Sequence, residues 1–358
     1  MKVRFCIILI ILLQFGFAAE RDFKGQLSVQ GSGWNNDGIW DGGIGAQYIP
    51  NLRISNQLSP MSLVDFEVSV YGYINKEAGE ASNDFRPYRF NLRYATQQSE
   101  AQIGLQKINF GPAQLLRSLM WFDRQSPTDP MNISEGVWGL RYKYIFLNNA
   151  NIWLWGLYGN ENPKGHEFYS SANDKPEFGG RVQTPIPLGE MALTFHSRTA
   201  KGGGQNFREN RFALDGRWDV VVGAWFEAVV QNVHGSGSNY FTKMLTLGTD
   251  YTFGIGNGLY VLGEHMITQT ADELLSSNRE YQISALMINY PLGMFDNLSL
   301  MAFYSWDTED VIQYIAWQRA YDKFSINMAL FHFPDTQFST INVTNGDLGV
   351  RLILIYNH

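Results

Sequence analysis

The sequence of 358 residues predicts an all-β protein, a closed antiparallel up-and-down β-barrel of about eighteen strands. Three observations support this fold class. Apolar and polar residues alternate with period two in segment after segment, as they do in strands with one apolar face. The composition combines 15% aromatic residues with 35 glycines, which is typical of large β structures with many turns. Beyond the N-terminus, no apolar run approaches the ~20 residues that a membrane-spanning helix requires.

The N-terminal segment has the layout of a secretory signal peptide. Lys2 and Arg4 precede an apolar run over residues 5–13, and small residues follow. We expect residues 1–19 to be removed, which leaves one domain over residues 20–358. The alternative is an N-terminal membrane anchor, but the apolar run is too short to span a bilayer.

The only cysteine, Cys6, lies inside this segment. The exported chain would therefore have no disulfide, no thiolate metal site and no cysteine nucleophile. The formal net charge is −7, and removal of Lys2 and Arg4 makes it more negative. An acidic protein lacks the basic footprint of nucleic-acid binding, so we expect no nucleic-acid partner.

The period-two segments follow one another along residues 20–358. In chain order they are 22–31, 39–56, 63–75, 84–96, 99–108, 135–146, 150–160, 176–185, 189–199, 207–217, 219–233, 240–253, 257–269, 279–291, 296–307, 311–320, 322–333 and 345–357.

Longer polar connections alternate with short turns between these segments. The predicted longer connections include 76–83, 109–134, 161–175, 200–206 and 234–239, and the short ones include 97–98, 147–149 and 186–188. Barrels of the bacterial outer membrane have this pattern, with long extracellular loops and short periplasmic turns. An even number of strands places both chain termini on the periplasmic side.

The two faces of the predicted strands indicate a transmembrane barrel. In the segment EGVWGLRYKYIF, Trp138, Leu140 and Tyr142 alternate with Arg141 and Lys143. A soluble barrel buries the apolar face, whereas a membrane barrel turns it toward lipid and fills the lumen with polar groups. The second face is rich in Gly, Ser, Asn and Arg over all eighteen strands, and aromatic residues cluster at strand ends, as in interfacial girdles. We therefore expect a barrel in the outer membrane, surrounded by lipid.

The last strand, GDLGVRLILIYNH, resembles the terminal targeting strand of bacterial outer-membrane proteins, although it ends in Tyr356-Asn357-His358 rather than in Phe or Trp. The eighteen-strand layout and the arginine-rich wall resemble outer-membrane porins of the alginate-export type. The segments LMWFDRQSPTDP and GVWGLRYKYIFLNNANIWLWGLYGNENPKG are also similar to uncharacterised barrels of Bacteroidota-type bacteria. The resemblance implies a passive pore with a basic lumen.

An eighteen-strand barrel leaves an aqueous channel, and inward-facing charges would select its solutes. The predicted pore-lining basic arc consists of Arg89, Arg93, Arg141, Lys143, Arg181, Arg198, Arg211 and Arg217. Glu209 and Asp215 oppose it on the same strands. The excess of cations favours anions, but the same residues would equally serve to brace the wall.

The connection 109–134, NFGPAQLLRSLMWFDRQSPTDPMNIS, is the longest loop and is too apolar to extend into solvent. The spacing of its apolar residues predicts two helical turns over 114–122. We expect this loop to fold into the lumen, where Arg117, Asp123 and Arg124 would be the charges of a constriction. The alternative is an outer lid or a patch packed against the rim.

The sequence does not indicate an enzyme, a cofactor or a metal site. The six histidines lack metal-ligand spacing, and no GxSxG motif occurs. His196 and Ser197 are adjacent on a strand, so they face opposite sides.

The predicted function is passive diffusion or export of small hydrophilic solutes, among them anions or acidic oligosaccharides. The alternative is a non-conducting barrel that binds a ligand or partner through its extracellular loops. Assembly into a homo-oligomer is open on the sequence alone.

Overall fold

The computed structural model describes residues 19–36, 38–131, 133–235, 238–334 and 348–358. Except for Ala19, the predicted signal peptide lies outside these residues. The described part contains nineteen strands. Among the described residues, no helix is long and apolar enough to cross a membrane.

The strands are β1 (Glu20–Asn36), β2 (Ile39–Ser59), β3 (Ser62–Glu77), β4 (Glu80–Thr96), β5 (Ser99–Gln106), β6 (Val137–Ile145), β7 (Asn151–Leu157), β8 (Ser170–Ser171), β9 (Glu177–Ile186), β10 (Gly189–Gly202), β11 (Gln205–Asp219), β12 (Gly223–Gly235), β13 (Ser238–Phe253), β14 (Leu259–Ala271), β15 (Arg279–Pro291), β16 (Asp296–Ser305), β17 (Val311–Ala320), β18 (Phe324–His332) and β19 (Leu348–Asn357).

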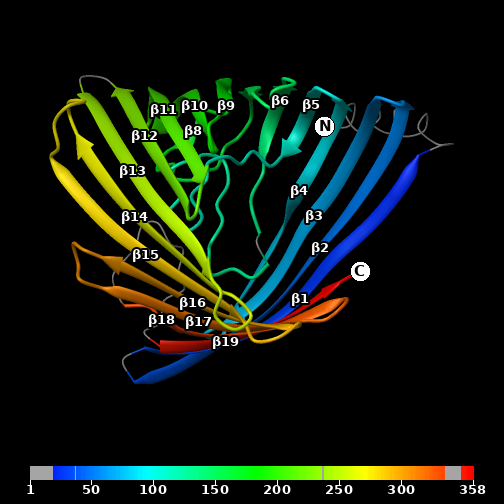
Figure 1. Cartoon of the computed structure of the whole chain (residues 1–358), viewed down its shortest axis with the longest axis vertical. Helices are drawn as coiled ribbons and strands as arrows, with labels where there is room; N and C mark the ends of the chain where they lie inside the picture. Colours follow the sequence, from blue (N-terminus) through cyan, green and yellow to red (C-terminus); the bar gives the residue numbers. More distant parts are fainter. Residues whose placement is uncertain (1–18, 37, 132, 236–237, 335–347) are drawn as a thin grey trace.

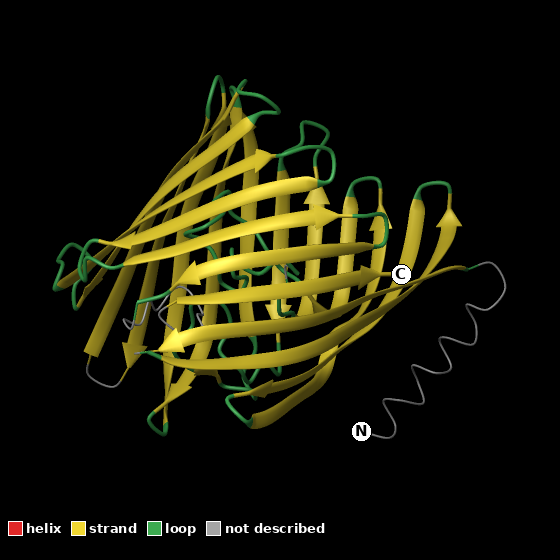
Figure 2. Cartoon of the chain, turned by 90° about the horizontal axis from the view of Figure 1, so that it is seen from below, coloured by secondary structure: helices red, strands yellow, loops and turns green. Residues whose placement is uncertain are grey.

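These strands form one closed antiparallel wall (Figures 1 and 2). Each strand pairs with its neighbours in sequence, and β1 closes the ring by pairing with both β2 and β19. The two-residue β8 is not a wall strand of its own, because β7 pairs with β9 and β8 only extends the pairing of β10. The wall thus has eighteen strands, which confirms the predicted fold class.

The wall has two edges, which we name by their connections. At the turn edge lie residues 60–61, 97–98, 146–150, 187–188, 220–222, 254–258, 292–295 and 321–323. At the loop edge lie 78–79, 107–136, 158–176, 203–204, 272–278 and 306–310, among others.

Two of the predicted long connections are wrong. The segments 76–83 and 200–206 contain two-residue hairpins at 78–79 and 203–204, because the flanking strands continue further than the alternation indicated. Gly79, Gly203 and Gly204 have positive φ angles of 85°, 58° and 78°, which glycine adopts without strain. The third, 234–239, lies partly outside the described residues.

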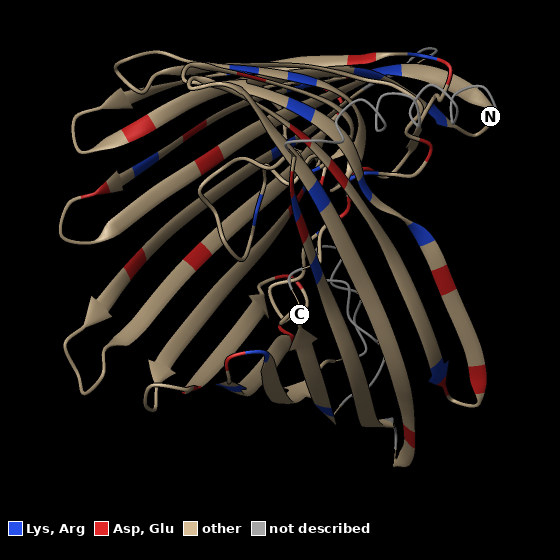
Figure 3. Ribbon diagram, turned by 90° about the vertical axis from the view of Figure 1, so that its right-hand side faces the viewer, with Lys and Arg blue, Asp and Glu red and all other residues tan. Residues whose placement is uncertain are grey.

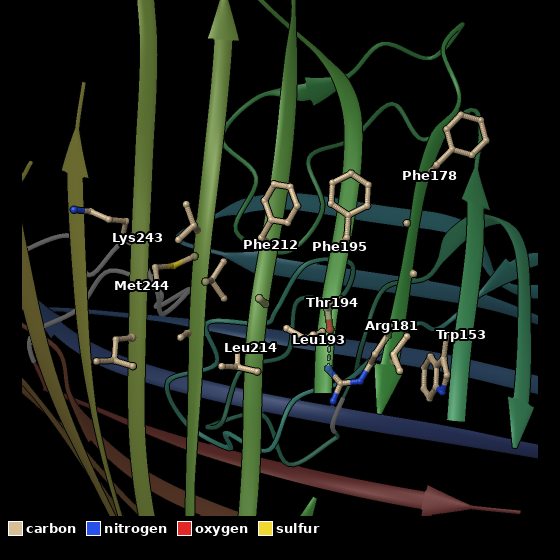
Figure 4. Close-up of a pocket in the computed structure, with 18 of the residues that line it drawn as sticks. Trp153, Phe178, Arg181, Leu193, Thr194, Phe195, Phe212, Leu214, Lys243 and Met244 are labelled. Carbon is tan, nitrogen blue, oxygen red and sulfur yellow. Dashed lines mark hydrogen bonds between the residues drawn. The ribbon is translucent and has the colours of Figure 1, made fainter. Parts of the chain in front are cut away.

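The outward face of the wall is apolar. Leu140 and Phe146 are 50% and 41% exposed, whereas Arg141 points to the interior, as the alternation predicts. An apolar groove of about 1060 Å³ crosses the outward faces of β7 to β14. Figure 4 shows Phe195 and Phe212 side by side at this groove, where their ring centroids are 4.9 Å apart.

The inward face of the wall differs in composition between two groups of strands. On β3 to β11 it carries most of the charged residues. Figure 3 shows basic and acidic residues interspersed along the strands of the wall. On β14 to β19 it is largely apolar, and Met266, Phe303, Ile312 and Ile353 are at most 3% exposed. The expectation of a polar interior around all eighteen strands is therefore correct for only part of the wall.

Candidate functional site: the loop inside the barrel

The connection between β5 and β6, residues 107–136, occupies the interior of the barrel (Figures 1 and 2). Its side chains Leu116, Leu119, Trp121 and Phe122 are at most 2% exposed. The segment 114–122 consists of bends and turns, so the predicted helix is wrong. The backbone N–H groups that a helix would satisfy internally need partners elsewhere.

Glu264 of β14 supplies many of these partners. Its Oε1 accepts hydrogen bonds from the backbone N–H of Gln114 at 2.7 Å and from the indole of Trp225 at 3.0 Å. Its Oε2 accepts from the N–H groups of Leu115 at 2.9 Å and Leu116 at 2.5 Å. Since Glu264 is only 4% exposed, these N–H donors compensate the desolvation of its charge.

Glu227 of β12 binds the loop in the same way. Its Oε1 accepts from the N–H of Ala113 at 3.0 Å and its Oε2 from the N–H of Leu119 at 2.8 Å. Next to it, the hydroxyl of Thr246 on β13 donates to the carbonyl of Leu116 at 2.8 Å. Three neighbouring strands therefore fix one stretch of loop backbone to the wall.

Gly111 makes the close approach to Glu227 feasible. Its φ is +94°, an angle that residues with a Cβ atom rarely adopt. A Cβ at this position would collide with the carboxylate of Glu227 and would lie 3.0 Å from Leu119. The loop backbone can approach the inner face of β12 this closely only because residue 111 has no side chain.

The apolar residues of the loop divide between two neighbouring clusters, both of which include residues of β12. Leu115 and Leu116 pack in the cluster that includes Phe303 on β16. Leu119 and Phe122 belong to the other cluster, which includes Trp155 on β7. The loop thus contributes buried side chains to both clusters.

The three predicted constriction charges have different environments. Arg117 donates to the Asp123 carboxylate at 3.1 Å and to Asn109 at 2.9 Å, and Asp123 is 1% exposed. This pair is internal to the loop. Arg124 is exposed, and its Nε donates to the carbonyl of Gly165 at 3.0 Å.

Two cavities flank the loop. One, of about 510 Å³, lies between its two limbs and is lined by Arg117, Gln125 and Asp129 among others. The other, of about 370 Å³, lies between the loop and β9 to β11. Asn109, Gly111 and Pro112 line both cavities, so this short stretch separates them.

Most residues of the predicted basic arc point inward but are paired with carboxylates. Arg93 binds Asp65 and Glu100, Arg141 binds Glu100, and Arg181 forms a two-bond pair with Asp215 at 2.6 and 2.7 Å. Arg198 and Arg211 both bind Glu167 and Glu209, and Arg217 binds Asp219.

The remaining two members of the arc have no carboxylate partner among the described residues. Arg89 donates to the carbonyl of Ser134 at 2.9 Å, and the Lys143 ammonium lies 4.6 Å from the ring centroid of Trp153.

The predicted excess of positive charge along the arc is therefore smaller than expected, because acidic partners were left out. Glu100 and Glu177 lie on strands and face the interior, and Glu167 comes from the loop between β7 and β9. The alternation contained a signal for the first two, since Glu177 shares the inward register of Arg181 on β9. No sequence pattern indicated that Glu167 folds back against the wall.

Glu227 and Glu264 hold the internal loop, and the sequence analysis did not single them out. The available signal was their position on inward faces beside apolar neighbours, where an unpaired carboxylate needs donors from elsewhere in the chain. Among the described residues, no cluster of His, Asp and Glu has the arrangement of a metal site.

No protein-family model matches the sequence, and no curated protein matches it either. Solved structures match the fold. An anion-selective porin from Comamonas acidovorans has a TM-score of 0.55 and 12% identity, over 95% of this chain and 100% of that chain.

Two structures from Acinetobacter baumannii are similar as well. OccAB1 has a TM-score of 0.60 and 8% identity, over 96% of this chain and 97% of that chain. The outer membrane channel DcaP has a TM-score of 0.52 and 11% identity, over 95% of this chain and 98% of that chain. At these identities the likeness establishes the architecture alone: this chain has the fold of bacterial outer-membrane porins.

Proposed function

We propose that this protein is a channel of the bacterial outer membrane through which small hydrophilic solutes diffuse passively. The observation that carries the proposal is the loop 107–136, which the carboxylates of Glu227 and Glu264 hold inside an eighteen-strand barrel. A closed barrel of this size has room for water, and a fixed internal loop narrows it to molecular dimensions. The likeness to porin structures supports the same function.

We propose a modest preference for anions, which rests on a smaller set of cations than the eight-residue arc. Lys107, Arg124 and Lys143 have no carboxylate within 4.0 Å among the described residues, and all three are at least partly open to solvent. The paired arginines brace the wall, because each is neutralised by an adjacent carboxylate. The permeating solutes would be small anions or acidic oligosaccharides, in line with the resemblance to barrels of the alginate-export type.

Export through a cleaved N-terminal signal and insertion into the outer membrane complete the proposal. The outward apolar face supports the membrane location. One of the similar structures, OmpT of Vibrio cholerae, is described as a trimer form, which makes a homo-oligomer a reasonable state for this chain as well.

The test is single-channel recording of the refolded protein in a planar bilayer under a KCl gradient. We expect discrete conductance steps and a reversal potential displaced toward that of chloride. Lys107→Gln combined with Lys143→Gln should reduce the displacement, whereas Lys323→Gln, in an exposed turn, should not. Absence of steps would refute the channel and favour a sealed barrel that binds its partner through the loops.

A further inference from the structure

The tips of the turns at the turn edge are apolar. Six of the eight turns expose a large aliphatic or methionine side chain. These residues are Met61, Leu147, Leu188, Val221, Ile255 and Met294, with exposed fractions of 63%, 92%, 66%, 78%, 58% and 90%. Tight turns usually carry Gly, Pro, Asn, Asp or Ser, because these residues suit the backbone and the surrounding water.

The described hairpins at the loop edge differ from those at the turn edge. The connections 78–79 and 203–204 have Ala-Gly and Gly-Gly tips, and 306–310 contains Asp307, Glu309 and Asp310. Other connections at the loop edge do expose large apolar side chains, namely Leu274 and Leu275 in 272–278, Phe168 in 158–176 and Trp306 in 306–310. Among the described connections, exposed aliphatic or methionine tips on hairpin after hairpin are a feature of the turn edge.

Aromatic side chains on the outward face directly adjoin several of these tips. Tyr144 and Phe146 precede Leu147, and their ring centroids are 4.9 Å apart. Tyr251 and Phe253 precede Ile255 by a similar interval, with ring centroids 4.8 Å apart. Aromatic girdles of membrane barrels lie at the boundary between hydrocarbon and headgroups.

The interval between girdle and tip fits the thickness of the headgroup layer. The tip residue follows the last aromatic residue by one position in the first hairpin and by two positions in the second, and each extended residue spans roughly 3.3 Å. The polar layer on each side of a bilayer is about 5–7 Å thick. The tips would therefore end within this layer and would not reach the water beyond it.

We propose that the turn edge is a lipid-binding surface, whose apolar tips insert into the headgroup layer and set the depth of the barrel. The inference rests on the outer-membrane location in the proposed function. Two observations favour lipid over a protein partner. The tips are continuous with the outward apolar face, and they are distributed over six hairpins around the rim, whereas protein interfaces usually gather such residues in one patch.

The test places a fluorescent label at one tip at a time. In a Cys6→Ser chain, which has no other cysteine, Met294→Cys or Leu147→Cys is labelled with an environment-sensitive fluorophore. The protein is reconstituted into phosphatidylcholine vesicles, with and without lipids that carry a nitroxide near the headgroup. Thr308→Cys, at the loop edge, is the matched control. Heat-modifiable migration on gels confirms that each labelled barrel is folded.

We expect both tip labels to emit at shorter wavelength than the Thr308 label, and to be quenched at least about twofold more by the nitroxide lipid, as a label within the headgroup layer would be. Aqueous iodide should quench them less than it quenches the control. Tip labels that iodide quenches as strongly as the control, with no quenching by nitroxide lipid, would overturn the inference. The inference would also be overturned if the tip labels were protected from iodide only after addition of a protein fraction from native membranes, and not by lipid alone.

Conductance of the same labelled proteins separates this inference from the proposed function. If the protein shows conductance steps but iodide quenches the tip labels as strongly as the control, the inference of a lipid-binding turn edge is wrong and the channel function stands. Lipid-quenched tip labels without steps would support the edge and refute the channel.

Discussion

The Oε2 atom of Glu264 accepts a 2.5 Å hydrogen bond from the backbone N–H of Leu116, a residue 148 positions earlier in the chain. This contact joins the wall to the internal loop without a counter-cation. A carboxylate that is bound only by N–H groups fixes a backbone more tightly than a neutral acceptor does, because hydrogen bonds to a charged group are about twice as strong as those between neutral groups. The position of the constriction is therefore sensitive to the charge of one buried side chain.

Replacement of Glu264 by Gln should loosen the loop. The amide retains one acceptor oxygen but turns an NH₂ group toward backbone N–H donors, so at least one of these donors loses its partner. We expect a loss of about 1–3 kcal/mol in the free energy of unfolding, which is the usual cost of a buried unsatisfied polar group. Single-channel recordings should show larger or noisier open states. Glu280→Gln, at an exposed carboxylate, should change neither quantity.

Gly111→Ala should displace the loop at the stretch that separates the two cavities. The added Cβ requires a strained backbone at φ +94° and collides with Glu227. We expect a stability loss above about 1 kcal/mol, from the strain of a non-glycine residue at this angle, together with altered conductance. Gly263→Ala is the control, since a Cβ there meets nothing within 4 Å. Equal behaviour of the two variants would argue against a role for residue 111.

Removal of one carboxylate from the buried charge cluster near the loop edge should strongly destabilise the protein. Glu209 binds Arg198 at 2.7 Å and Arg211 at 2.5 Å, and all three are at most 2% exposed. Glu209→Gln leaves two buried arginines with fewer carboxylates, so we expect a loss of about 3–5 kcal/mol in urea unfolding. Asp22→Asn, which breaks the exposed pair with Lys24, should change stability by less than about 0.5 kcal/mol. A small effect of Glu209→Gln would mean that water reaches this cluster.

Acid should weaken the contact between the two longest described loops. The backbone N–H of His166 donates to the carbonyl of Met120, and its Nε2 lies 2.7 Å from the carbonyl of Arg117. Burial lowers the pKa of His166 below 6.5, and Arg211 and Arg117 lower it further. The unfolded segment therefore binds a proton at a pH where the folded segment does not.

The sign of the effect follows directly. The contribution of His166 is complete above about pH 6.5 and falls as the pH drops below that value. We expect open-channel noise to rise between pH 7 and pH 5 in the wild type, and His166→Gln to remove most of this dependence. Persistence of the full pH dependence in His166→Gln would assign it to other groups.

Alternation predicted the barrel well, because a strand residue in a wall has only two choices of face. The outward orientation of Trp138, Leu140 and Tyr142 could therefore be predicted before any partner strand was known. The internal loop was harder to predict. Leu115 and Leu119 have helical spacing, yet they belong to different apolar clusters. The spacing arose from two separate contacts, and a helix period cannot distinguish these from one buried face.

The predicted net charge of the basic arc was too high for a related reason. Each arginine was assigned to the correct side of its strand, but its electrostatic role depends on which acids come near it. Glu167 reaches Arg198 and Arg211 from a loop with no periodic pattern. Net charge along a wall is a property of three-dimensional neighbours, so strand registers alone overestimated it.

The pairing of β1 with β19 also has a consequence for biogenesis. The backbone of Gly25 exchanges two hydrogen bonds of 3.0 Å with that of His358, which follows β19. Until β19 takes its place between them, β1 and β18 would each present an unpaired edge to other strands. Because such edges favour aggregation, a folding chain is most vulnerable before β19 closes the ring.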